Sequence, residues 1–214
     1  MSIIVERFDK IKSNIDEKVT IIAISKTFPL SHIKPLIDYG HRDFGENKVQ
    51  EAEIKWKEIK KRQNNLKLHM VGKLQSNKAK KAVEIFDYIH SLDSKKLADQ
   101  LCKFETQMNK KLKYFIQVNI GKEKQKSGID PIELDAFLSY CVNEKKLNII
   151  GLMAIPPNDG KEDTYFKYLY ETNASLGLKD LSMGMSADYK IALKYNTTFI
   201  RIGSLIFGER SWDS

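Results

Sequence analysis

One lysine directly follows a short apolar run, where its amine could act as a nucleophile. The apolar residues 21–24 precede Ser25 and Lys26. If this run is a buried strand, the lysine stands at its end, where partial loss of water disfavours the ammonium form and lowers the amine's pKa. A neutral amine can attack an aldehyde and form a Schiff base. The alternative interpretation is an ordinary solvated lysine.

Two later segments combine glycine with hydroxyl residues. Residues 182–186 read Ser-Met-Gly-Met-Ser, and residues 201–204 read Arg-Ile-Gly-Ser. Glycine permits close backbone approach, and Ser186 is placed to cap a following helix whose first amides would face an anion. In α/β barrels, the loops after the last two strands often bind phosphate. Ordinary turn and capping chemistry is the alternative for each loop.

Other polar residues lie within or just after apolar runs. Arg201 belongs to the run 198–202, and alternation along a strand could turn its guanidinium to the interior, where it needs an acceptor. An outward salt bridge is the alternative. Asn47 follows the run 42–44, and His69 lies within the run 67–71. A lone histidine of this kind is more often a hydrogen-bonded core residue than a ligand, and the remaining histidines lack metal-ligand spacing.

The elements that must position these residues alternate in type along the chain. Short apolar or β-branched runs predict strands at 20–24, 42–44, 67–71, 88–91, 113–119, 148–153, 180–183 and 198–202. Helical periodicity is clearest over 47–61, 94–108 and 131–142. Ser94 is the expected cap of the second of these helices, and Pro131 opens the third. A further helix is expected at 3–15, before the first strand.

Eight strands that alternate with helices can form two main architectures, a closed parallel barrel or an open doubly wound sheet. The number of strands favours an α/β fold of the (β/α)8 TIM type, because eight units close the sheet and remove its edges. We expect one domain over residues 1–214 with an extra N-terminal helix, because no linker or compositional break divides the chain. The functional surface would then lie at the carboxyl ends of the strands.

Composition excludes several classes of protein. The formal net charge is +8, but few of the 36 basic residues are arginine and the lysines are mixed with acids, which is typical of solvated helix faces. We expect no specific nucleic-acid binding, although a nucleic-acid-binding module remains a rival that rests on this charge. We also expect no membrane segment, no secretory leader, and no disulfide framework or zinc site from the two cysteines. A cytoplasmic location follows as an expectation.

Several motifs occur together and in order between residues 19 and 210. They include Ala-Ile-Ser-Lys-Thr at 23–27, Phe-Gly-Glu-Asn-Lys-Val-Gln-Glu at 44–51, His-Met-Val-Gly-Lys-Leu-Gln-Ser-Asn-Lys at 69–78, Gln-Val-Asn-Ile at 117–120, Lys-Ser-Gly at 126–128, Gly-Leu-Met-Ala-Ile at 151–155, and the two loops at 182–186 and 201–210. In this combination the chain resembles the pyridoxal-phosphate homeostasis protein family. That family is a single-domain relative of the barrel half of alanine racemase.

The resemblance implies pyridoxal 5′-phosphate as the cofactor, with Lys26 as the lysine that forms the Schiff base. The resemblance also implies that Ser186, Gly203 and Ser204 hold the phosphate. It implies that Arg201 faces the pyridine nitrogen, and that Asn47 and His69 line the pocket. Two departures from the family pattern are visible. Asn196 stands where glycine is usual before the last strand, and Ser204 replaces a frequent threonine while keeping the hydroxyl.

The chemistry of this residue set favours a binding protein. Because arginine stays protonated, a pyridine nitrogen that accepts a hydrogen bond from Arg201 remains unprotonated and the ring is a poor electron sink. In alanine racemase, a tyrosine from another domain supplies a second acid or base, and we expect no such domain in a chain ending at Ser214. The sequence therefore predicts a monomer without dedicated catalysis that carries or buffers the cofactor for vitamin B6 and amino-acid homeostasis. It could transiently meet pyridoxal-phosphate enzymes; a weak pyridoxal-phosphate-dependent racemase is the alternative.

Overall fold

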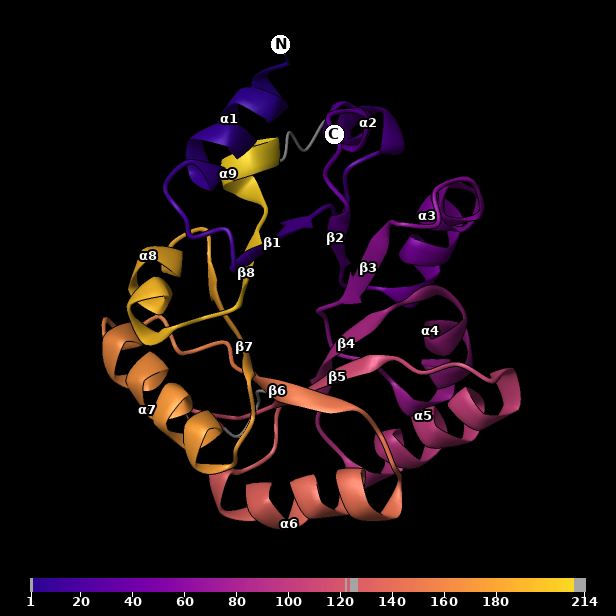
Figure 1. Ribbon diagram of the computed structural model, residues 1–214, viewed down its shortest axis with the longest axis vertical. Coiled ribbons are helices and arrows are strands. Elements are labelled where there is room, and N and C mark those ends of the chain that lie inside the picture. The colour runs from indigo at the N-terminus through magenta and orange to yellow at the C-terminus, as the bar shows by residue number, and fades with distance from the viewer. Residues whose placement is uncertain (1, 122, 124–126, 210–214) are drawn as a thin grey trace.

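The computed structural model describes residues 2–121, 123 and 127–209. Parts of the motifs at 126–128 and 201–210 lie outside these residues. Within the described part of the chain, eight parallel strands pair in sequence order, and β1 also pairs with β8 (Figure 1). The strands are β1 (Thr20–Ile24), β2 (Asp43–Glu46), β3 (Lys67–Met70), β4 (Tyr88–Leu92), β5 (Lys113–Gln117), β6 (Ile149–Met153), β7 (Asp180–Met185) and β8 (Phe199–Ile202). This closed barrel confirms the predicted fold and excludes the open sheet.

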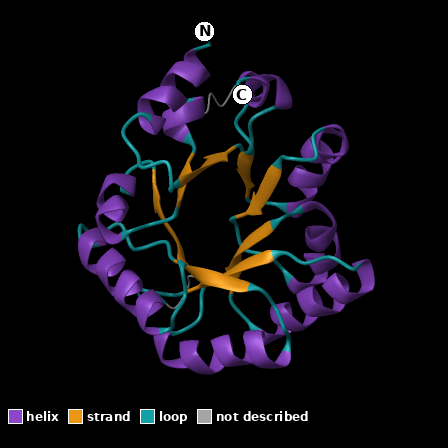
Figure 2. Cartoon of the chain, in the orientation of Figure 1, coloured by secondary structure: helices purple, strands orange, loops and turns teal. Residues whose placement is uncertain are grey.

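Helices surround the barrel as an outer ring (Figure 2). Among the described residues they are α1 (Ile3–Lys12), α2 (Leu30–Asp38), α3 (Val49–Arg62), α4 (Ala79–Ile85), α5 (Lys95–Met108), α6 (Leu134–Ser139), α7 (Glu162–Ser175), α8 (Tyr189–Ala192) and α9 (Ser204–Phe207). None of these described helices has the length and apolar character needed to cross a bilayer.

The predicted helix start at Ser94 is confirmed, whereas the helix predicted at 131–142 has a different geometry. The Ser94 hydroxyl caps α5 by accepting a hydrogen bond from the Leu97 amide at 3.3 Å. The segment predicted as one helix at 131–142 is instead a 3₁₀ turn, α6 and a wider π turn at Tyr140–Glu144. Its inward residues Leu134, Phe137 and Cys141 are nevertheless buried.

The extra N-terminal helix completes the ring of helices. The helix that follows β8, α9, is only four residues long and is too short to cover that side of the barrel. Helix α1 packs against α9 and α2, as Figure 1 shows where α1 and α9 lie side by side. Its buried face, formed by Ile4, Val5, Phe8 and Ile11, covers the apolar surface there.

Two apolar layers hold the strands in place. The larger layer lies between the strands and the helices, and alternate residues of the strands point into it. A smaller cluster fills the barrel interior and contains Ile22, Ile24, Val71, Phe115, Met153 and Phe199. Because both faces of a parallel sheet are covered in this way, the polar residues that point inward stand out.

Candidate functional site

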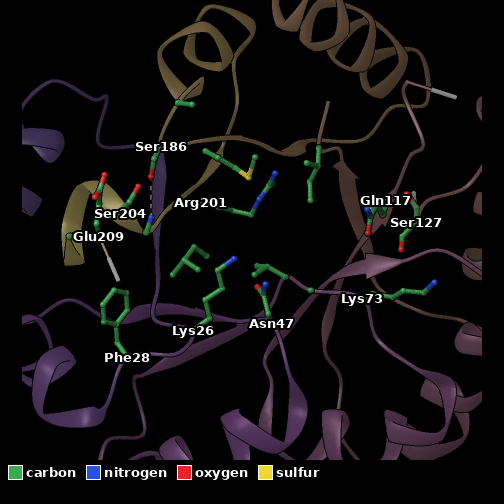
Figure 3. Close-up of a pocket in the computed structure, with 18 of the residues that line it drawn as sticks. Lys26, Phe28, Asn47, Lys73, Gln117, Ser127, Ser186, Arg201, Ser204 and Glu209 are labelled. Carbon is green, nitrogen blue, oxygen red and sulfur yellow. Dashed lines mark hydrogen bonds between the residues drawn. The ribbon is translucent and has the colours of Figure 1, made fainter. Parts of the chain in front are cut away.

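A cavity of about 930 Å³ opens at the carboxyl ends of the strands. Most of its lining residues lie at the ends of β1, β2, β3, β5, β6, β7 and β8 or in the segments that follow them. The cavity therefore lies on the predicted functional face, and its size is within the range of small-molecule sites. Figure 3 shows Lys26 and Asn47 reaching into it from one side, with Arg201 and Ser186 on the other side.

The turn that carries Lys26 is held in an unusual conformation. Lys26 follows the buried Ser25 and lines the cavity with a half-buried side chain. The next residue, Thr27, has a φ of 67°, which lies in the left-handed region. This conformation costs a β-branched residue about 1–3 kcal/mol and needs support from its surroundings. The Glu51 carboxylate supplies such support by accepting a hydrogen bond from the Thr27 amide.

A buried ion pair between Glu46 and Lys55 holds the start of the same turn. One oxygen of the fully buried Glu46 accepts hydrogen bonds from Ser25 Oγ at 2.7 Å, Lys55 Nζ at 2.8 Å and Trp56 Nε1 at 2.9 Å. Lys55 also donates to the Ser25 carbonyl at 2.8 Å and to Glu51 at 3.1 Å. Glu46 of β2 therefore holds the side chain of the residue before Lys26, and Lys55 of α3 holds its backbone carbonyl. We call Ser25, Glu46, Glu51 and Lys55 the turn-support network.

The two predicted anion loops meet at the cavity wall. The Gly203 amide donates to Ser186 Oγ at 3.4 Å (Figure 3), and Ser204 begins α9 directly after it. All three residues line the cavity. The expectation that Ser186 caps the following helix is wrong: the N-cap of α8 is Asp188, whose carboxylate accepts from the Met185 amide at 2.6 Å. The Ser186 hydroxyl lies in the turn before that helix and contacts the other loop.

Arg201 points into the barrel interior and lines the cavity, as alternation along β8 predicts. Its Nη1 donates to the Ser182 carbonyl at 2.8 Å and to Ser182 Oγ at 2.7 Å, and its Nη2 donates to the Ala154 carbonyl at 2.9 Å. These bonds use three of the five N–H groups of a guanidinium. Burial lowers the pKa of Arg201 to about 10, so the side chain remains a cation at neutral pH.

Asn47 and His69 have different environments. Asn47 lines the cavity and lies against Gly72, where an added Cβ would come within 2.4 Å of the Asn47 carbonyl oxygen. His69 is fully buried inside the barrel, stacks on Tyr88 at 4.3 Å and bonds to His90 at 2.9 Å. It is not among the residues that line the cavity. Its position is therefore that of the core histidine named as the alternative, because its ring nitrogens are used within the barrel.

Further residues that were not predicted as site residues complete the cavity wall. The additional polar and aromatic lining residues are Phe28, Lys73, Gln117, Asn119, Ser127 and Glu209. Four of them, Phe28, Lys73, Gln117 and Asn119, lie at the end of β1, β3 or β5 or within four residues after it, where the rule of strand ends places functional residues. Asn196 adopts a φ of 52°, a left-handed conformation that asparagine tolerates, and this explains how it replaces a usual glycine.

The donor set suits an anion that also carries a reactive carbonyl. The cavity presents a primary amine, two hydroxyls, a backbone amide and a guanidinium, which are the groups of Lys26, Ser186, Ser204, Gly203 and Arg201. Hydroxyl and amide donors near a short helix match a phosphate, and the amine can react with an aldehyde. Among the described residues, no group of three or more His, Cys, Asp or Glu side chains could hold a metal ion.

Comparison with known proteins agrees with this geometry. Residues 2–211 match the family described as alanine racemase, N-terminal domain. The pyridoxal phosphate homeostasis protein of Aquifex aeolicus is 37% identical to this chain, and the match covers 90% of this chain and 87% of that protein. The protein of the same name from Escherichia coli K12 is also 37% identical, and the match covers 92% of this chain and 88% of that protein.

Solved structures show the same similarity. PipY of Synechococcus elongatus PCC7942 without PLP is 38% identical, with a TM-score of 0.91 over 96% of this chain and 100% of that chain. The PLP-bound form of PipY gives a TM-score of 0.88 with the same identity and coverage. The chain thus belongs to the pyridoxal phosphate homeostasis protein family, and it also matches the alanine racemase N-terminal domain family.

Proposed function

We propose that this chain binds pyridoxal 5′-phosphate in the cavity and carries or buffers it as a Schiff base on Lys26. The observation that carries the proposal is that one cavity holds both the Lys26 amine and an anion cradle, by which we mean Ser186, Gly203 and Ser204. Lys26 reaches in from one wall, while Ser186 and the Gly203 amide lie on another (Figure 3). The aldehyde and the phosphate of this cofactor lie at different positions on one ring, so both anchors can act together. The PLP-bound structure of PipY supports this choice of ligand.

The residues around the ring position favour storage over catalysis. A bound pyridoxal phosphate supplies an electron sink whose strength depends on protonation of its ring nitrogen. Arg201 is a cation that only donates hydrogen bonds, so a ring nitrogen facing it would stay unprotonated. The relatives are named as homeostasis proteins, which agrees with a role in vitamin B6 and amino-acid homeostasis without a dedicated reaction. We extend the proposal to a cytoplasmic monomer that meets pyridoxal-phosphate enzymes transiently.

Spectroscopic titration tests the proposal. We expect pyridoxal 5′-phosphate to give the wild-type protein a visible absorption band that is absent from Lys26→Ala. Lys73→Ala is the matched control, because it removes a different amine from the lining of the same cavity and should keep the band. An unchanged band in Lys26→Ala would contradict the proposal.

A weak amino-acid racemase is the second candidate, and the match to the alanine racemase N-terminal domain favours it. Two-base racemisation needs an acid or base on each face of the ring. The described residues that line the cavity include Lys26 and Glu209 but no tyrosine. Incubation of the loaded protein with single-enantiomer amino acids in deuterated water distinguishes the two functions. Slow exchange without inversion supports the binding role, whereas rapid exchange with inversion supports the racemase.

A further inference from the structure

A continuous chain of polar side chains runs through the barrel interior and ends at Arg201. Asp43 Oδ1 lies 3.0 Å from His69 Nε2, and His69 Nδ1 lies 2.9 Å from His90 Nε2. His90 Nδ1 lies 2.8 Å from Ser182 Oγ, which in turn lies 2.7 Å from Arg201 Nη1. The residues come from β2, β3, β4, β7 and β8, and we call them the barrel chain. Asp43, His69 and His90 are not among the described residues that line the cavity.

The barrel chain is enclosed by aromatic rings. His69 stacks on Tyr88 at 4.3 Å, and His90 stacks on Phe115 at 4.4 Å. Phe199 lies about equally far from both imidazoles, with ring centroids 6.0 Å away in each case. Both histidines are fully buried, so their four ring nitrogens depend on each other and on the two ends of the chain for hydrogen bonds.

The chemistry of the two ends fixes the direction of every bond. An ionised carboxylate only accepts hydrogen bonds, so His69 Nε2 donates to Asp43. In a neutral imidazole the other nitrogen then accepts, so His69 Nδ1 accepts from His90 Nε2. His90 Nδ1 must therefore accept from the Ser182 hydroxyl, and this leaves a lone pair of Ser182 Oγ for Arg201. A guanidinium only donates, which matches this end of the chain.

Burial supports the neutral state of both rings that this direction needs. Loss of water lowers the pKa of His69, against the opposing effect of Asp43 and Asp87, and Lys60 adds to the lowering. Loss of water also lowers the pKa of His90 to well below its usual range, and the positive Arg201 and the neighbouring His69 act in the same sense. A charged imidazolium at either position would have two donor nitrogens and would break the single direction.

We propose that Asp43, His69, His90 and Ser182 are positioning residues that hold the Arg201 guanidinium in place by a hydrogen-bond chain of one fixed direction. Because the Ser182 proton is committed to His90, the Ser182 oxygen stays turned toward Arg201 Nη1. The Asp43 carboxylate polarises each hydrogen bond of the barrel chain, which makes the Ser182 oxygen a stronger acceptor for the Arg201 guanidinium. The consequence for a bound ring nitrogen rests on the proposed function, whereas the chain itself is a property of the free protein.

Nitrogen-15 NMR of the histidine side chains, recorded on the full chain without cofactor, tests the direction. We expect His69 and His90 each to carry one proton, on Nε2, without change between pH 8 and pH 5.5. A proton on Nδ1 of either ring, or titration within that range, would overturn the proposal. Because no cofactor is present, this result is independent of whether pyridoxal phosphate binds.

One substitution tests the long-range part of the chain. Asp43→Leu removes the acceptor that fixes the direction, so we expect Nδ1-protonated forms of His90 to appear although Asp43 does not touch that ring. Asp38→Leu is the control, because its carboxylate pairs with Lys34 at the surface. If His90 keeps its wild-type spectrum in a folded Asp43→Leu protein, the proposal is wrong. If this variant does not fold, the wild-type spectrum alone decides.

The effect on Arg201 has its own readout. Ser182→Ala removes one acceptor of the guanidinium, and we expect its rotation, measured by nitrogen-15 exchange NMR, to become about tenfold faster. Ser91→Ala is the matched control. Ser91 is also buried and directly follows His90 in β4, and its hydroxyl has no hydrogen-bond partner among the described residues. Equal rotation rates in Ser182→Ala and the wild type would contradict the positioning role.

Discussion

The turn-support network predicts a large loss of stability from a single lysine substitution. Lys55→Met keeps the length and most of the apolar part of the side chain but removes its ammonium. The side chains of Lys55 and Glu46 are only 9% and 0% exposed, so the variant leaves a carboxylate buried beside a vacated partner position. Breaking a buried ion pair on one side costs about 3–5 kcal/mol.

An exposed ion pair of the same type gives the reference value. Lys34 and Asp38 pair at 2.6 Å with side chains that are 64% and 57% exposed. Lys34→Met should therefore cost less than about 1 kcal/mol, because water already solvates both charges. The free energy of unfolding is measured for both variants by urea denaturation at pH 7.5. If Lys55→Met differs from Lys34→Met by less than 1 kcal/mol, the buried pair does not hold the turn as described.

A double variant, Lys55→Met with Glu46→Gln, distinguishes the cost of an unpaired buried charge from the cost of lost packing. Glu46→Gln removes the negative charge, and its amide oxygen can still accept from Ser25 and Trp56. We expect Lys55→Met combined with Glu46→Gln to be more stable than Lys55→Met alone. A double variant that is less stable by the sum of both single effects would show that the two side chains act independently.

Three further predictions use other features of the site and the barrel. Gly72→Ala should destabilise the protein by about 1–3 kcal/mol in urea unfolding, because the new Cβ would lie 2.4 Å from the Asn47 carbonyl oxygen; a neutral effect would mean that the two segments can separate. Burial lowers the pKa of His41 to about 4, below the value near 6.5 expected when unfolded. The unfolded state therefore binds the proton first, so this stabilising contribution is complete above about pH 6.5 and is lost as the pH falls toward 4. Urea unfolding from pH 7.5 to 4.5 should show a shallower decline for His41→Gln than for wild type. Ser186→Ala and Ser204→Ala should each weaken pyridoxal-phosphate retention by about 1–3 kcal/mol in equilibrium dialysis, and unchanged retention in both would remove the anion cradle.

The fold could be predicted because its signal is local and repeated. Each strand of the barrel is a short apolar run, so eight runs with helices between them identify the architecture even though single bounds shift. The run at 42–44, for example, becomes β2 at Asp43–Glu46. The Ser94 cap was also predictable, since a cap depends only on residues three positions apart.

The site was predictable only where a residue acts at the end of its own strand. Lys26, Gly203 and Arg201 are of this kind, and all three line the cavity. The partners of Glu46 were not predictable, because they depend on how α3 is rotated against β1 and β2. The bond between His69 and His90 likewise depends on the register between neighbouring strands, which a single sequence does not specify.

Reductive trapping identifies the lysine that forms the Schiff base with pyridoxal 5′-phosphate. The protein is incubated with pyridoxal 5′-phosphate, treated with borohydride, digested and analysed by mass spectrometry, with the intact protein measured under native conditions. We expect a single phosphopyridoxyl adduct per chain on the peptide that contains Lys26. An adduct on another lysine, or none on the Lys26 peptide, would contradict this expectation.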